Sequence, residues 1–465
     1  MGVPSSEGAP VSFSNPIFPD LGFADERSPR YERHRAALGC GCGPPMKKLA
    51  ALALALSFTP GCTCSSPPDA AASGSAPVGS DAATVSASAE ASPFIHHKTK
   101  TTEPAVALTN LKSQLNGQIK LMADRPKDLQ ARSAVVSISL ARFKLLGKSE
   151  DLTRAIELAE SATTIEEKSF AALFLRARGR AAAHRFDEAL ADLDAADKVV
   201  VLPEDKGRTN GTRANILIAL GRYEEALPTI EKAARVHPDS DALADHAYLL
   251  GLMGKSTEAE SLFVQAEQKH RGTSPFGLVQ IYFDRGSMWE KQGNLTEATA
   301  LYKAAYAKLP QHPHVAVHLA SLLPPAEGVA VLEPVAKETD DPDVFAELGT
   351  LQNLVKAGSG DAMIEKAGAA YDELFAKLPS GYADHAGWFW VTTGNDPKKA
   401  LTAAQKNIGV RQTADAYELL IAAAEAAKDT AVLCTALKGA KALKYSTPPL
   451  KERVRQLDGK AGCGD

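Results

Sequence analysis

The sequence predicts an all-α protein, a solenoid of repeated helix pairs. Alanine is abundant, whereas aromatic residues make up only 6% of the 465 residues. Small apolar side chains suit close packing between helices better than sheets, which favour β-branched and aromatic residues. A short motif of a glycine followed five residues later by an alanine recurs along the chain, and its equivalents return about every 35 residues. Periods of 20 to 50 residues are typical of solenoids and other repeat arrays.

The repeat is clearest in three segments, where a large apolar residue follows the alanine by four positions and a proline follows it by twelve. These segments are Gly221, Ala226, Ile230 and Pro238; Gly293, Ala298, Tyr302 and Pro310; and Ala367, Tyr371 and Pro379. The full series of equivalent positions is Ala155, Ala189, Ala226, Ala259, Ala298, Gly328, Ala367 and Ala400. We expect the small residue to lie where two helices cross, because a larger side chain would push them apart.

Two segments resemble the W-x2-L-G-x2-Y signature of the tetratricopeptide repeat (TPR), whose period is 34 residues. They are Tyr282-x2-Arg285-Gly286-x2-Trp289 and Phe345-x2-Leu348-Gly349; Arg285 departs from the family leucine. The resemblance covers roughly residues 127 to 433. It implies a right-handed α-solenoid of about eight degenerate TPR helix pairs. We expect an added helix over residues 104–125 and a C-terminal capping helix from Pro448 to Asp458, which a solenoid needs for solubility.

Residues 46–61 have the layout of a secretory signal peptide. Lys47 and Lys48 precede an apolar run that ends at Phe58, and Gly61 precedes Cys62. The run is about half of the ~20 residues needed to span a bilayer. The Gly61-Cys62 pair resembles the lipobox of bacterial lipoproteins, which implies lipidation of Cys62. Thr59 and Pro60 depart from that pattern, so export without a lipid is the alternative.

The segments on either side of the signal peptide show no pattern that predicts a folded structure. Residues 1–45 are either the product of a start codon assigned too early or a long charged region before the signal peptide. Residues 62–103 are rich in Ser, Ala, Gly and Pro, which predicts a disordered tether. Residues 104–465 form the predicted solenoid with its terminal capping helices.

The sequence contains few features that would suggest nucleic-acid binding, catalysis or metal binding. A net charge of −4 gives no basic field for nucleic acid. No phosphate-binding, nucleophile-elbow or zinc-protease motif is present, so we expect no enzyme activity and no cofactor. His312, His314 and His318 are the best metal candidates, but no carboxylate lies nearby in sequence, and we favour structural histidines and no metal.

Two further features concern the core. In Trp388-Phe389-Trp390 we expect one or two side chains in the core, since neighbours on a helix point in different directions. Cys434 and Cys463 either form a disulfide in an oxidising compartment or, in the case of Cys434, leave a buried thiol.

The TPR resemblance implies a concave face, lined by the first helix of each pair, that binds a protein or peptide. Candidate groove residues are Arg178, Arg208, Asn215, Asp245, Tyr248 and Asp284, with an ordinary solvated helix face as the alternative. The predicted function is a scaffold secreted across the inner membrane and lipid-anchored in the envelope, on its periplasmic or outer-membrane side. The alternatives are an adaptor of a TonB-type transport or cell-wall machine and, less favoured, a metal-dependent enzyme.

Overall fold

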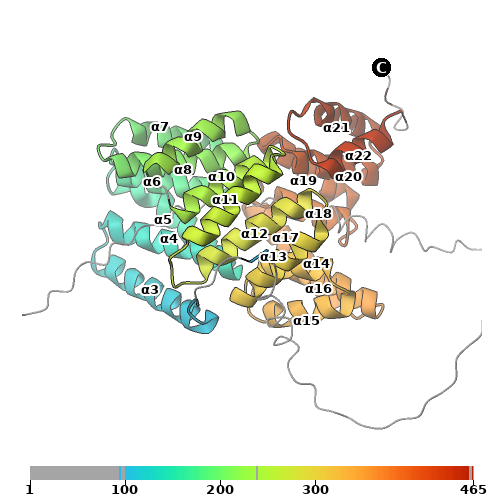
Figure 1. Cartoon of the computed structure of the whole chain (residues 1–465), viewed down its shortest axis with the longest axis horizontal. Helices are drawn as coiled ribbons and strands as arrows, with labels where there is room; N and C mark the ends of the chain where they lie inside the picture. The colour runs from blue at the N-terminus through green and yellow to red at the C-terminus, as the bar shows by residue number, and fades with distance from the viewer. Residues whose placement is uncertain (1–93, 96–99, 237–238, 460–462, 464–465) are drawn as a thin grey trace, which may run out of the picture.

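The computed structural model describes residues 94–95, 100–236, 239–459 and 463. The predictions for the start codon, the signal peptide, Cys62 and most of the tether therefore concern residues outside the described ranges. Within these ranges every regular element is a helix, which confirms the all-α fold class (Figure 1). No helix in the described part is long and apolar enough to cross a membrane.

The described helices form nine consecutive helix–turn–helix pairs, each packed on the next. The pairs are α4 (Leu129–Leu146) with α5 (Ser149–Glu160), α6 (Phe170–Ala182) with α7 (Phe186–Asp197), α8 (Pro203–Ala219) with α9 (Tyr223–Val236), α10 (Ser240–Leu252) with α11 (Ser256–Lys269), α12 (Phe276–Lys291) with α13 (Leu295–Lys308), α14 (Pro313–Leu322) with α15 (Pro325–Ala336), α16 (Pro342–Val355) with α17 (Asp361–Lys377), α18 (Ala383–Val391) with α19 (Pro397–Val410), and α20 (Ala414–Ala427) with α21 (Thr430–Ala442). A 3₁₀ turn, η1 (Ser161–Thr164), follows α5.

The array has one pair more than the repeat series located. The extra pair is α20 with α21. The fourth residue of α21 is Leu433 instead of alanine, so a search for the repeated alanine does not find this pair. The expected terminal helices are present as α3 (Pro104–Asp124) and α22 (Pro448–Leu457).

A left-handed residue ends the first helix in most pairs. Gly147, Gly221, Gly254 and Gly293 have φ between +64° and +81° in these turns, a conformation that glycine adopts without steric cost. His184 takes the same place in the second pair with φ +55°, although it has a side chain. The turn glycine of the sequence pattern is thus the stop signal of the first helix.

The small residue of the repeat lies in the second helix and is buried. The seven alanines of the series are all 0% exposed, and Gly328 is buried too. In the first pair the residue five after the turn glycine Gly147 is Leu152, and Ala155 lies about one helical turn further along α5. In the seventh pair Ala367 keeps the same distance to the end of its helix as Ala298 does, and Tyr371 at +4 is buried as Tyr302 is.

The first helices form the inner row of the superhelix. Neighbouring first helices contact one another along most of the array, from α4 and α6 to α18 and α20, so they occupy the shorter arc. They are also more enclosed. Every residue of α18 from Ala383 to Trp390 is buried, whereas only Ala367 and Tyr371 are buried in α17. All three residues of the Trp388-Phe389-Trp390 cluster are therefore core, more than we expected, because α18 is covered on all sides.

The superhelix completes one turn in about six pairs, so each of the first three pairs contacts the pair six positions later. The turn of the first pair meets the start of the seventh, where Ser149 N and Oγ donate to Asp340 Oδ2 at 3.1 and 2.8 Å. The second pair meets the eighth between His184 Nδ1 and the Ser380 carbonyl, 3.2 Å apart. The third meets the ninth, where Gln412 N donates to Leu220 O at 3.5 Å. We call these three sites the inter-turn contacts.

The third pair also contacts the chain near its C-terminal end. Glu224 forms an ion pair with Lys444, and the rings of Tyr223 and Tyr445 lie 5.7 Å apart. The segment before α20 and the loop between α21 and α22 therefore both contact the α8–α9 pair.

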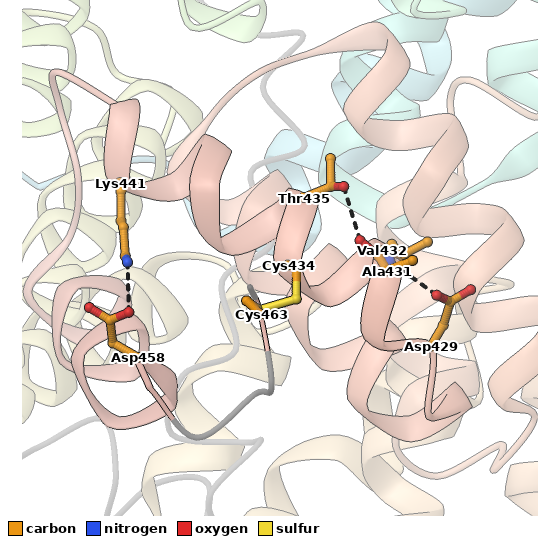
Figure 2. Close-up of a disulfide and its surroundings, with 8 residues drawn as sticks. All are labelled: Asp429, Ala431, Val432, Cys434, Thr435, Lys441, Asp458 and Cys463. Atoms are coloured by element: carbon orange, nitrogen blue, oxygen red, sulfur yellow. Dashed lines mark hydrogen bonds and ion pairs between the residues drawn. A yellow bond between two sulfur atoms is a disulfide. The ribbon is translucent and has the colours of Figure 1, made fainter. Parts of the chain in front are cut away.

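A disulfide fastens the C-terminal end of the chain. Cys434 in α21 is bonded to Cys463, with the Cα atoms 5.5 Å apart, and the bond bridges the cap helix α22 (Figure 2). Lys441 Nζ also contacts Asp458 Oδ1 at 2.7 Å across the same loop. The last pair and the cap are thus covalently linked.

Candidate partner-binding surface

The six candidate groove residues lie on four successive helices of the inner row. Arg178 is on α6, Arg208 and Asn215 are on α8, Asp245 and Tyr248 are on α10, and Asp284 is on α12. These four helices contact one another in order. We call the six residues the inner row site.

The two arginines of the inner row site lie close together. Arg178 Nη1 donates to Ser137 Oγ at 2.7 Å. Burial and the nearby charge of Arg208 lower the pKa of Arg178 to about 10. Arg208 pairs with Asp205 at 2.9 Å and places its guanidinium 4.6 Å from the centre of the Phe174 ring. The N-terminal end of the site is therefore electropositive, with both guanidinium groups held in place.

The remaining candidates differ in exposure. Asn215 and Asp245 are only 8% and 4% exposed, so they shape the surface more than they offer atoms to a ligand. Tyr248 and Asp284 are half-buried, and Asp284 Oδ1 accepts a hydrogen bond from Gln280 at 2.6 Å. The side chains with accessible polar or aromatic surface are thus Arg178, Arg208, Tyr248 and Asp284.

Of the three candidate metal histidines, His312 and His318 are buried and His314 is half-buried. His318 Nδ1 lies 2.8 Å from Glu290 Oε2, which also accepts from the Tyr302 hydroxyl at 2.7 Å. His312 caps α14, where its Nδ1 accepts from Val315 N at 3.4 Å. Its ring centre is 6.1 Å from that of His314. Among the described residues no group of three or more His, Cys, Asp or Glu side chains could hold a metal ion.

A second carboxylate–histidine pair lies in the same region. His385 Nδ1 is 2.5 Å from Asp343 Oδ2, and the Tyr371 hydroxyl donates to the other oxygen of Asp343. Burial lowers the pKa of His314 to about 3 and that of His312 well below its ordinary value. His312 and His314 are therefore neutral in the folded protein at pH 7.

His184 is a buried residue of the inter-turn contacts that the sequence analysis did not single out. Its Nδ1 accepts a hydrogen bond from Arg411 Nη2 at 2.7 Å, and Arg411 Nη1 lies 3.2 Å from Asp384 Oδ2. Burial and the Arg411 charge lower the pKa of His184 to about 3. The available signal was its position in the repeat, since His184 stands where other pairs have a turn glycine.

Comparisons with known proteins support the repeat. Residues 245–313, which include the fourth and fifth pairs, match the tetratricopeptide repeat family. No curated protein matches the chain.

Solved structures with similar folds share little sequence with the chain. YrrB, a TPR protein with an unusual peptide-binding site, is 16% identical, covers 43% of this chain and 95% of its own, and has a TM-score of 0.26. Human IFIT1, solved as a dimer with m7Gppp-AAAA, is 14% identical, covers 78% and 89%, and has a TM-score of 0.40. The matched chain in the Cut9–Hcn1 hetero-tetramer of APC/C is 14% identical to this chain. The match covers 64% of this chain and 56% of its own, with a TM-score of 0.38.

At these scores the structures say nothing about what this chain binds. The fold is an α-solenoid of helix pairs, and residues 245–313 within it match the tetratricopeptide repeat model.

Proposed function

We propose that the chain is an envelope-anchored scaffold that binds a protein or peptide partner on the inner row site. The observation that supports this proposal is the row of neighbouring first helices α6, α8, α10 and α12, which carry Arg178, Arg208, Tyr248 and Asp284. Arginine and tyrosine are enriched at the residues that dominate protein–protein binding energy. The segment matched to the tetratricopeptide repeat covers two of the four helices.

The envelope location draws on two separate features. One is the order of Lys47, Lys48, the apolar run and Gly61-Cys62. The other is the bond between Cys434 and Cys463, because disulfides persist in oxidising compartments such as the periplasm and are rare in the cytosol. A lipid on Cys62 would hold the solenoid to a membrane through residues 62–103.

Site-specific photocrosslinking in intact cells tests the binding surface. A photoreactive phenylalanine analogue replaces either Tyr248 on α10 or Glu258 on α11, the outer helix of the same pair, where the Glu258 side chain is 64% exposed. We expect one discrete adduct at position 248 and none at 258. Equal adducts at both positions, or none at either, would contradict the proposed surface.

Membrane fractionation tests the anchor. The Cys62→Ala variant should move from the membrane fraction to the soluble fraction, because a lipid on Cys62 is the only anchor that the sequence predicts. Cys64→Ala is the matched control and should stay with the membranes. A Cys62→Ala protein that remains membrane-bound would rule out this anchor.

A further inference from the structure

Arg285 is a buried cation at a position where the repeat family has leucine. Its side chain in α12 is 1% exposed. A guanidinium at such a site must be paired, since burying an uncompensated charge is strongly unfavourable. The pairing comes from α11: Glu260 Oε2 accepts from Arg285 Nε at 2.9 Å, and Glu267 Oε2 lies 3.4 Å from Nη1.

Two neighbouring side chains hold these carboxylates. The Trp289 indole donates to Glu260 Oε2 at 3.1 Å, and the Tyr282 hydroxyl donates to Glu267 Oε1 at 2.9 Å. The network fixes the orientation of the guanidinium from both sides. We call the set of Glu260, Glu267, Arg285 and Trp289 the Arg285 site.

The Arg285 site also binds the backbone carbonyl of Phe94, a residue that lies 191 positions earlier in the sequence. Arg285 Nη1 donates to Phe94 O at 2.6 Å, and the side chains of Phe94 and Ile95 pack against the largest core cluster. A second backbone contact follows downstream, where Thr102 N donates to Thr273 O at 2.7 Å. An oriented cation that binds a backbone carbonyl, next to apolar surface that contacts the side chains, is a combination suited to a short peptide segment.

The bound residues lie in the part of the sequence that predicts a disordered tether. Residues 62–103 contain few large apolar side chains, and Phe94 and Ile95 are adjacent exceptions. Two side chains and one charge-assisted hydrogen bond form a small interaction by themselves. Attachment to the same chain raises the effective concentration of the segment, typically to the millimolar range for short flexible links.

We propose that the Arg285 site is a binding site for a short aromatic–aliphatic peptide segment and that Phe94–Ile95 occupies it as a tethered internal ligand. This surface lies between α11 and α12 and is distinct from the inner row site, so the inference goes beyond the proposed function. Occupation of the site fastens the end of the tether to the fifth helix pair. Release would lengthen the tether and free the site for a segment of the same chemistry.

The test uses the full chain and a blocked, fluorescently labelled peptide with the sequence Ser-Pro-Phe-Ile-His-His, followed by anisotropy. The Phe94→Ala/Ile95→Ala double variant vacates the site, and Val106→Ala, 51% exposed on α3, is the matched control. We expect the double variant to bind the peptide at least tenfold more tightly than the parent or the control. A peptide with alanines at the Phe and Ile positions should not bind. Equal binding by parent and double variant, or no binding by either, would overturn the proposal.

Hydrogen exchange supplies a readout that does not depend on the added peptide. In the double variant the Thr102 amide should exchange faster, because the segment that leads to it is released, while the amides of α12 keep their protection. An unchanged Thr102 amide would show that Phe94 and Ile95 do not hold the segment. Uniformly faster exchange across α12 would show that they are structural core residues, which also contradicts the proposal.

Discussion

Gly221 and Gly254 occupy the same place in two helix pairs but have different surroundings. Both have left-handed backbones, with φ +79° and +76°. An added Cβ at Gly221 would lie 2.8 Å from the backbone oxygen of Gln412 in the next superhelical turn, whereas at Gly254 it would meet nothing within 4 Å. The two positions therefore separate the cost of the backbone conformation from the cost of disturbing the inter-turn contact.

The expected free energies of unfolding follow from these distances. Alanine in the left-handed conformation costs about 1–2 kcal/mol, and this applies to both Gly221→Ala and Gly254→Ala. Overpacking typically adds about 1–3 kcal/mol, and this applies only to Gly221→Ala. We therefore expect destabilisation of about 2–5 kcal/mol for Gly221→Ala and about 1–2 kcal/mol for Gly254→Ala.

Urea unfolding followed by circular dichroism measures this difference. Gly293→Ala, with φ +81° and open space around the new Cβ, is a second control. Hydrogen exchange of the Gln412 amide, which donates to Leu220 O, should increase in Gly221→Ala and stay unchanged in Gly254→Ala. If the three variants lose the same stability, the stacking of successive turns is wrong.

Two further predictions concern packing and acidity. Ala367→Leu should lower the unfolding free energy by ~1–3 kcal/mol because Ala367 is 0% exposed, while Ala369→Leu on the exposed side of α17 should change it by less than ~0.5 kcal/mol; similar urea midpoints would contradict the repeat packing. The pKa values of His184 and His314 are lowered to about 3 by burial, so the folded state binds fewer protons than the unfolded state below pH 6.5. Each histidine should then remove roughly 2 kcal/mol of stability between pH 6.5 and 5, so the His314→Gln variant should lose less stability than the parent over this interval; equal losses in the two proteins would refute the reasoning.

The sequence by itself determined the repeating unit. A glycine that ends one helix and a small residue where the next one crosses it are local requirements, so they recur at fixed spacing and can be counted. The same reasoning assigned Arg208 and Tyr248 to first helices, because helix order alone decides that assignment. It also predicted α3 and α22 from their position at the ends of the array.

Only the tertiary structure decided how successive turns meet. Ser149 and Asp340, or His184 and Arg411, are brought together by the accumulated rotation of six helix pairs, which no local period encodes. The same holds for the Glu290 partner of His318 and for the contact between Arg285 and Phe94. In the sequence Arg285 is a departure from a family pattern; in the fold it is a buried charge whose carboxylate and carbonyl partners make the substitution tolerable.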